Sequence, residues 1–131
     1  MLTIACVLRA GGKVGYDSSW VQKLQNMLTR NITRPFQLIC LSDVDVPCQR
    51  IPLDSLGAGY WAKLQLFKPG QFDGPVLFFD LDTVICNNLD LLIDKLIDQD
   101  HFVMWHDSWY NLSSSAIMYW NGDYSHIYKT D

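Results

Sequence analysis

The chain has 131 residues, of which 49% are hydrophobic and 18% charged, with ten Lys and Arg against fourteen Asp and Glu and a net charge of −4. This length and apolar content predict one folded domain, residues 1–131, and exclude a disordered or low-complexity chain. The acidic balance without a Lys/Arg cluster argues against nucleic-acid binding. No apolar run is long enough to span a bilayer, so we expect a cytoplasmic protein without a transmembrane segment.

The first third of the chain predicts a strand, a helix and a second strand. Thr3 to Leu8 is a β-prone run that ends at a glycine-containing turn. Asp17, Ser18 or Ser19 can cap the helix that follows. Its apolar residues recur at helical spacing and are Trp20, Val21, Leu24, Met27 and Leu28. Phe36 to Leu41 is the second strand, and such a unit predicts a parallel sheet with a right-handed crossover.

Strands and helices continue to alternate through the rest of the chain. The expected elements are a weak strand at Gln49 to Leu53, a short helix at Tyr60 to Phe67, a strand at Val76 to Phe79, a helix over Leu89 to Ile97, strands at Phe102 to Trp105 and Ala116 to Trp120, and a last helix at Asp123 to Lys129. Asn87 or Asn88 is the expected cap of the Leu89 helix. This order predicts an α/β fold with helices on both faces of a mostly parallel sheet.

Four cysteines are scattered along the chain, at Cys6, Cys40, Cys48 and Cys86. They form no CxxC pair and have no histidine at a zinc-site spacing. We expect reduced and mostly buried thiols.

The segment Phe78-Phe79-Asp80-Leu81-Asp82-Thr83-Val84 is the strongest candidate for chemistry. Ligands of open parallel sheets bind outside the carboxyl ends of the strands, where this strand delivers two carboxylates. If the segment stays extended, Asp80 and Asp82 project to the same side. Two carboxylates beside open coordination positions suit Mg²⁺ or Mn²⁺ that carries a diphosphate. The alternative is that an aspartate after a strand only caps a turn.

Two segments together resemble a known family. They are GYWAKLQLFKPGQFDGPVLFFDLDTVI at 59–85 and NLSSSAIMYWNGD at 111–123. Their order resembles nucleotide-sugar transferases of the GT-A fold, near glycosyltransferase family 8 and small bacterial or phage relatives. The resemblance implies a Rossmann-like GT-A nucleotide-diphospho-sugar transferase fold, a UDP-sugar donor, and a carbohydrate or other hydroxyl acceptor.

Donor-site residues follow from the resemblance position by position. Asp80 and Asp82 would bind the metal and the nucleotide, with Leu81 between them. Lys63 would approach the diphosphate or the sugar. The base would lie beside Val7, Leu8, Arg9 and Tyr16, and hydroxyls of the sugar would meet the serine run Ser113, Ser114 and Ser115.

The acceptor side of such a site has less support in the sequence. His106 and Asp107 follow a predicted strand and would face the same crevice, with Asp107 as the base for the acceptor and His106 as a ligand or a structural residue. The family usually takes a third metal ligand, often a histidine, from a later region. His126 is the only late histidine, and its surroundings do not match that motif. Three alternatives follow: water and substrate complete the metal site, or the chain lacks the usual C-terminal region of the family, or the activity is reduced.

Two other functions are compatible with the same residues. VLFFDLDTVI also resembles the first motif of haloacid-dehalogenase-type phosphatases, in which the first aspartate is the nucleophile and the second is the general acid beside Mg²⁺. That motif usually lies on the first strand and is followed by an acidic pair, whereas here 49 residues follow Asp82 and contain no acidic doublet. The other alternative is a non-catalytic nucleotide-sugar-binding domain.

Overall fold

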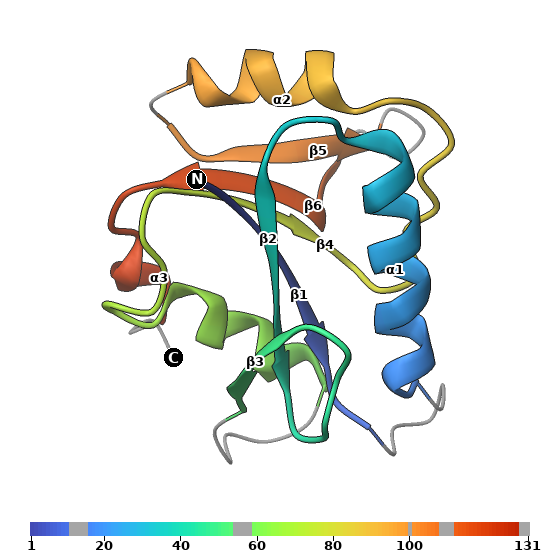
Figure 1. Ribbon diagram of the computed structural model, residues 1–131. Coiled ribbons are helices and arrows are strands. Elements are labelled where there is room, and N and C mark those ends of the chain that lie inside the picture. The colour runs from blue at the N-terminus through green and yellow to red at the C-terminus, as the bar shows by residue number, and fades with distance from the viewer. Residues whose placement is uncertain (11–15, 54–58, 100, 108–111, 129–131) are drawn as a thin grey trace.

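The computed structural model of the chain holds six strands in one mixed sheet, in the order β3-β2-β1-β4-β6-β5 (Figure 1). The strands are β1 Leu2–Leu8, β2 Phe36–Ser42, β3 Gln49–Pro52, β4 Pro75–Phe79, β5 Val103–Asp107 and β6 Leu112–Asn121. The structure describes residues 1–10, 16–53, 59–99, 101–107 and 112–128, without the side chains of 59–61, 105–107, 112–115 and 128. The predicted α/β class and mostly parallel sheet are confirmed.

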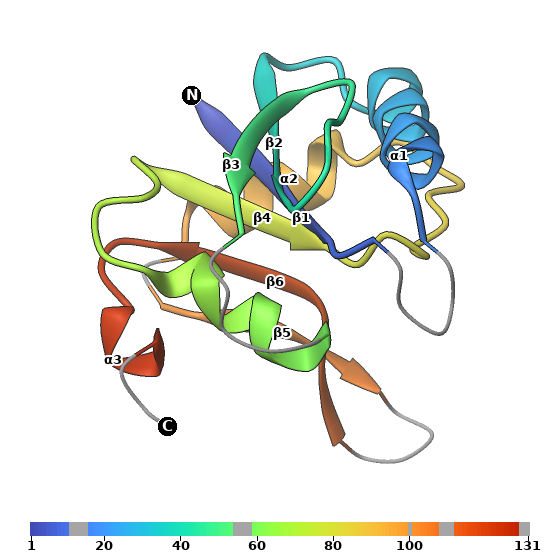
Figure 2. The ribbon, with the colours of Figure 1, turned by 90° about the horizontal axis from the view of Figure 1, so that it is seen from below.

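Helices cover both faces of this sheet, as predicted (Figure 2). They are α1 Ser18–Asn31, the 3-10 helix η1 Gly59–Phe67, α2 Asp90–Ile97 and α3 Ser125–Tyr128. Helices α1 and α2 pack on one face, while η1 and α3 pack on the other. None of the helices in the described part of the chain is long and apolar enough to cross a membrane.

The core lies on both faces of the two central strands, because alternate residues of each strand point to opposite sides. In β4, Leu77 and Phe79 are buried on the α1 face, and Val76 and Phe78 on the η1 face. Ala5 of β1 also faces η1. The continuous apolar run therefore correctly predicted a strand covered on both faces.

The two longer helices begin differently. The Asp17 carboxylate accepts a hydrogen bond from the Ser19 N–H at 2.9 Å and caps α1. At α2, the cap position is Leu89, whose side chain makes no capping bond, so the prediction of Asn87 or Asn88 is off by one or two residues. The Asn88 amide oxygen still accepts from the Asp90 N–H at 2.8 Å, which satisfies a donor that the helix leaves unpaired.

The order in which successive strands are added reverses at β1, and this reversal determines where a ligand can bind. The connection from β1 through α1 leads to β2 on one side of β1. The connection from β3 through η1 leads to β4 on the other side of β1, with the helix on the opposite face. The carboxyl ends of β1 and β4 therefore flank a topological switch point, where open α/β sheets bind their ligands.

The last two strands form a hairpin that reaches past the end of β4. Strand β6 runs antiparallel to both β4 and β5, with Phe79 opposite Ile117. Because β6 begins at Leu112, its first residues lie beyond the carboxyl end of β4 (Figure 2). The hairpin thus forms one side of the switch-point edge.

All four cysteines are free thiols, and two of them, Cys6 and Cys40, are buried. Cys6 lies opposite Cys40 in the register of β1 and β2, and their contact together with burial raises the pKa of the Cys6 thiol. Cys48 is half-buried and Cys86 is exposed, so the prediction of mostly buried thiols holds for only two of the four.

Candidate functional site

The segment that carries the two aspartates leaves β4 in a tight turn. The Asp80 N–H donates to the Ala116 carbonyl oxygen at 2.9 Å and completes the pairing of β4 with β6. The Thr83 N–H then donates to the Asp80 carbonyl oxygen at 3.1 Å, which closes a β-turn. The expectation of an extended segment is wrong, since the strand ends at Phe79. Asp82 still lies close enough for its charge to raise the pKa of Asp80.

Lys63 of η1 lies directly against the first aspartate. Its Nζ is 2.8 Å from Oδ1 of Asp80, and each of the two side chains is 27% exposed. The same Nζ lies over the ring of the buried Phe78 side chain, 5.5 Å from its centroid. Lys63, which was predicted to belong to the site, therefore contacts Asp80 directly.

Burial and charge act in opposite directions on Asp80. Burial is the largest influence and raises its pKa, the contact with Lys63 lowers it, and the charge of Asp82 raises it again. The net direction is upward. A carboxylate kept in a poorly hydrated place beside one cation and a second carboxylate is typical of binding and catalytic sites.

Tyr16 comes to the same site from the segment before α1. Its ring packs edge-on against Trp20, with centroids 4.8 Å apart. Partial burial, the charges of Asp82 and Asp80, and a hydrogen bond to Asp82 raise the pKa of the Tyr16 hydroxyl. Tyr16 therefore lies beside the acidic pair. The sequence predicted only that Tyr16 would lie beside the nucleotide base.

The end of β1 contributes mainly its backbone. Leu8 is completely buried on the α1 face, so it can offer a ligand only its main chain, and Leu81 is also buried. Val7 packs against the core of the η1 face, and Arg9, the next residue after the strand, is half-buried at the edge. A contact between the nucleotide base and Leu8 therefore stays a prediction that concerns only the main chain of this residue.

Asp43 is a structural residue of this edge that sequence reasoning missed. Its carboxylate accepts from the Ala10 N–H at 2.9 Å, and its own N–H donates to the Leu8 carbonyl oxygen at 3.4 Å. These bonds tie the end of β1 to the end of β2. An aspartate directly after a strand was the available signal.

The β5–β6 hairpin brings the remaining candidates to the same edge. Trp105 pairs with Ser114, His106 with Ser113, and Asp107 with Leu112. These pairs lie beyond Ala116, which bonds to Asp80. The side chains of His106, Asp107 and the three serines are outside the described part, so their roles stay predictions.

His126 lies away from the aspartates. It belongs to α3, which packs against η1. Helix α3 follows the end of β6, where Asn121 pairs with Pro75 at the amino end of β4. Its ring lies 6.0 Å from that of Tyr124. This placement agrees with the interpretation that His126 does not match the family's metal ligand.

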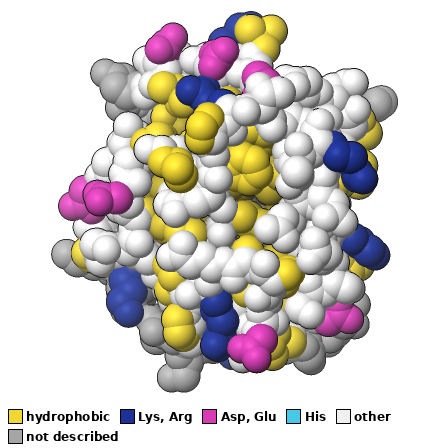
Figure 3. All heavy atoms as spheres, in the orientation of Figure 1, with side chains coloured by type: hydrophobic (Ala, Val, Ile, Leu, Met, Phe, Trp, Pro, Cys, Tyr) yellow, Lys and Arg dark blue, Asp and Glu magenta, His cyan; other side chains and the backbone are white. Residues whose placement is uncertain are grey.

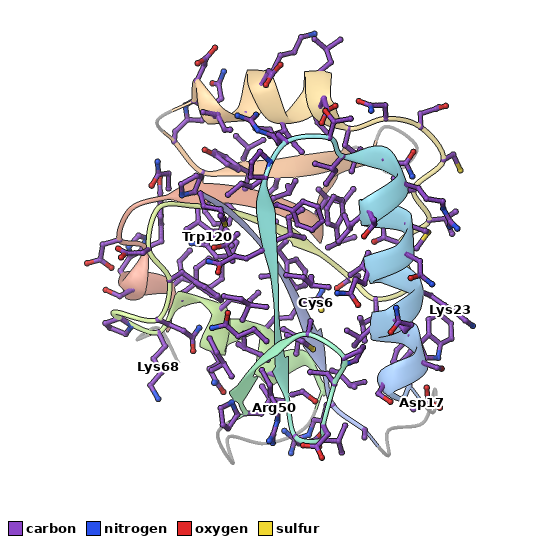
Figure 4. The ribbon with its side chains drawn as sticks, viewed as in Figure 1. Cys6, Asp17, Lys23, Arg50, Lys68 and Trp120 are labelled. Atoms are coloured by element: carbon purple, nitrogen blue, oxygen red, sulfur yellow. The ribbon has the colours of Figure 1, made fainter. Side chains whose placement is uncertain are left out.

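Besides a hollow of about 300 Å³ at the start of α1, two hollows of similar size lie near the two ends of β4. One, of about 350 Å³, lies at the amino end of β4 and includes Lys68, Asp73 and Trp120. The other, of about 310 Å³, lies between α1 and the segment after β4 and includes Asp82. Figure 4 shows Lys68 and Trp120 on the opposite side of the molecule from Asp17 and Lys23. We place the site at the switch point, where Asp80 and Lys63 meet, with the second hollow beside it.

The donor set fits a hard divalent cation. Asp80 is half-buried, Asp82 is exposed, and both offer the oxygen ligands that Mg²⁺ and Mn²⁺ prefer. Among the described residues, no group of three histidine, cysteine or acidic side chains forms a closed metal cage. Two carboxylates with open positions for water and phosphate oxygens match the way Mg²⁺ binds in phosphate-transfer sites.

Comparison with protein-family models finds no match for this chain, and comparison with curated proteins finds no relative.

Proposed function

We propose that the chain binds a nucleoside-diphosphate sugar, with UDP-hexose favoured, together with Mn²⁺ or Mg²⁺, and that it is a glycosyltransferase domain of the GT-A type. One observation carries the proposal: Asp80 and Asp82 lie just outside the carboxyl end of β4, at the switch point between β1 and β4, with Lys63 2.8 Å from Asp80. This arrangement supplies two anionic ligands for a cation and one cation for a phosphate group at the same edge.

The two aspartates would hold the metal, which neutralises phosphate charge when bound. Lys63 would neutralise charge that develops on the departing diphosphate as the glycosidic bond breaks. Because Lys63 now contacts Asp80, donor binding would move its Nζ from the carboxylate toward a phosphate oxygen.

The remaining groups would position the two substrates. Tyr16, whose hydroxyl lies near Asp82, would present its ring beside the nucleotide. Ser114 and Ser115 would bond sugar hydroxyls, and Asp107 would accept the proton of the acceptor hydroxyl, if the reaction inverts the anomeric centre.

A thermal-shift experiment tests this proposal. We expect UDP to raise the melting temperature only with Mn²⁺ or Mg²⁺ present, and Asp82→Asn to abolish the shift. Asp98→Asn is the matched control, because it removes an exposed carboxylate at the end of α2. Equal stabilisation without metal, or in Asp82→Asn, would contradict the proposal.

Turnover separates the alternatives. A glycosyltransferase releases UDP from a UDP-sugar in the presence of metal, either by transfer or by slow hydrolysis. A phosphatase would instead hydrolyse a generic phosphate ester and lose this activity in Asp80→Asn. Metal-dependent UDP binding without any turnover would identify a binding domain.

A further inference from the structure

The groove beside Asp82 continues along α1, away from the switch point. It lies between one face of α1 and residues 81–84, with Trp20, Lys23, Met27 and Arg30 on the helix side and Asp82 and Val84 on the other. Tyr16, at the start of α1, is next to Asp82, so the groove begins at the acidic pair and runs toward the end of the helix. It therefore shares one wall with the proposed donor site.

Hydrogen bonds fix the outer wall of this groove against α1. The Ile85 N–H donates to Sδ of Met27 at 3.4 Å, and the Asn31 side-chain amide donates to the Ile85 carbonyl oxygen at 3.5 Å. The Leu89 N–H donates to the Asn31 carbonyl oxygen at 2.7 Å. Leu81 and Ile85 are also buried beneath the wall. The groove is thus held by contacts between elements distant in sequence.

Positive charge and apolar surface alternate along the groove. Lys23 and Arg30 are exposed, and neither forms an ion pair within the described residues. They are seven positions apart, which is about 10 Å along a helix. Nζ of Lys23 lies 5.0 Å from the centroid of the Trp20 ring, and Val84 is 74% exposed on the opposite wall. Figure 4 shows Lys23 projecting from α1, and Figure 3 shows basic side chains along that edge of the molecule.

We propose that this groove binds the acceptor and that the acceptor carries a phosphate monoester, an inference that rests on the proposed function. Two unpaired cations in a chain of net charge −4 select an anion, and the guanidinium of Arg30 can form paired hydrogen bonds to a phosphate. Trp20, Met27 and Val84 would contact the apolar or sugar part of the same molecule.

The groove orients such an acceptor toward the donor. With its phosphate at Lys23 and Arg30, the acceptor would direct a hydroxyl toward Asp82. The hydroxyl oxygen would bond to the anomeric carbon as the bond from that carbon to the diphosphate oxygen breaks. The electron pair would leave with the nucleoside diphosphate, and in an inverting reaction the hydroxyl proton would pass to Asp107, the base of the proposed function. The product would be a glycosylated phosphate monoester.

Calorimetric titration of the chain without metal or nucleotide tests the groove. Glucose 6-phosphate and butyl phosphate are the probes, because they separate a sugar phosphate from a lipid-like one, and glucose and butanol are their neutral controls. We expect at least one phosphate to bind and neither neutral compound to do so. The double variant Lys23→Gln/Arg30→Gln should weaken binding by about tenfold, as expected for two lost charge-assisted contacts at an exposed site. Lys95→Gln, which removes an exposed lysine on α2, should have no effect.

The same variants distinguish failure of this inference from failure of the proposed function. Asp82→Asn should lose the metal-dependent UDP shift but keep phosphate-ester binding, and the double variant should show the reverse. Phosphate binding that is absent, or unchanged in the double variant, would overturn the groove assignment alone. Loss of UDP binding in the double variant would show that the groove holds the donor, and would also overturn it. If wild type shows no metal-dependent UDP binding, the proposed function fails and the acceptor assignment fails with it.

Discussion

Replacing Lys63 with methionine should destabilise the chain at neutral pH through its effect on Asp80. The two side chains meet at 2.8 Å and are each 27% exposed, so the pair is intermediate between a surface and a buried ion pair. Exposed pairs contribute about 0–1 kcal/mol, whereas loss of one partner of a buried pair costs about 3–5 kcal/mol. We therefore expect a loss of about 1–2 kcal/mol in the free energy of unfolding. Methionine is unbranched and of similar length, so the variant removes mainly the charge, together with the position of that charge over the Phe78 ring.

The dependence on pH follows from the direction of the Asp80 pKa. This pKa is raised above its ordinary value of 3.8, so the folded chain binds the proton more tightly than the unfolded chain does. The charged carboxylate therefore lowers stability as the pH rises from 3.8 to the folded-state pKa. Lys63→Met removes the influence that lowers the pKa and widens this window. Its destabilisation should be full at pH 7 and should shrink as Asp80 becomes protonated.

Urea denaturation between pH 3.5 and pH 8 measures this effect, on the wild type, Lys63→Met, Asp80→Asn and the double variant. Because burial outweighs the contact with Lys63, Asp80→Asn should be at least as stable as the wild type at pH 7. In the Asp80→Asn background, Lys63→Met should cost little. A loss that does not change with pH, or one of equal size in the Asp80→Asn background, would refute this reasoning.

Three further predictions concern the scaffold. Asp17→Ala should lower the melting temperature, because it removes the cap of α1. The hydrogen bonds from Ser19 hold the pKa of Asp17 below its ordinary value of 3.8. The cap therefore stabilises the chain above pH 3.8 and should lose this effect as the pH falls through the folded-state pKa of Asp17. Thermal melts of both proteins across this pH range would show the loss. Leu24→Ala should lower the free energy of unfolding in urea by about 2–5 kcal/mol, because Leu24 is completely buried on the inner face of α1. A smaller loss would contradict that burial. An aromatic disulfide reagent at pH 8 should react quickly with the exposed Cys86 and slowly with Cys48, because burial raises the pKa of the Cys48 thiol to about 11. Mass spectrometry of the labelled peptides checks this order. Fast labelling of Cys48 would contradict it.

The sequence predicted the fold better than the site because strands and helices follow local patterns. The apolar run at β4 and the helical spacing in α1 each depend on neighbours within a few residues. The antiparallel direction of β6 depends instead on pairing between segments distant in sequence. A two-residue spacing of aspartates is also the same in a strand and in a turn, which explains why the turn at Asp80 was missed.

Contacts within the site depend on packing that no local pattern encodes. The contact of Lys63 with Asp80 requires η1 to lie on the face toward which Asp80 points. The contact of Tyr16 with Asp82 requires the start of α1 to lie against the segment after β4. The position after a buried strand predicted Asp80 and Asp82, and a family resemblance added Lys63 and Tyr16, but neither could predict which of them touch.

Paramagnetic broadening of backbone amide signals by Mn²⁺ tests the central claim most directly, because it locates the metal on the chain. In the presence of UDP, substoichiometric Mn²⁺ should first broaden the amides of Asp80 to Thr83 and those at the end of β1, and Asp82→Asn should remove this effect. The amides around Lys68 and Asp123, which line the hollow at the amino end of β4, should stay sharp. Broadening centred on that hollow, or equal broadening in Asp82→Asn, would contradict a metal–diphosphate site at the carboxyl end of β4.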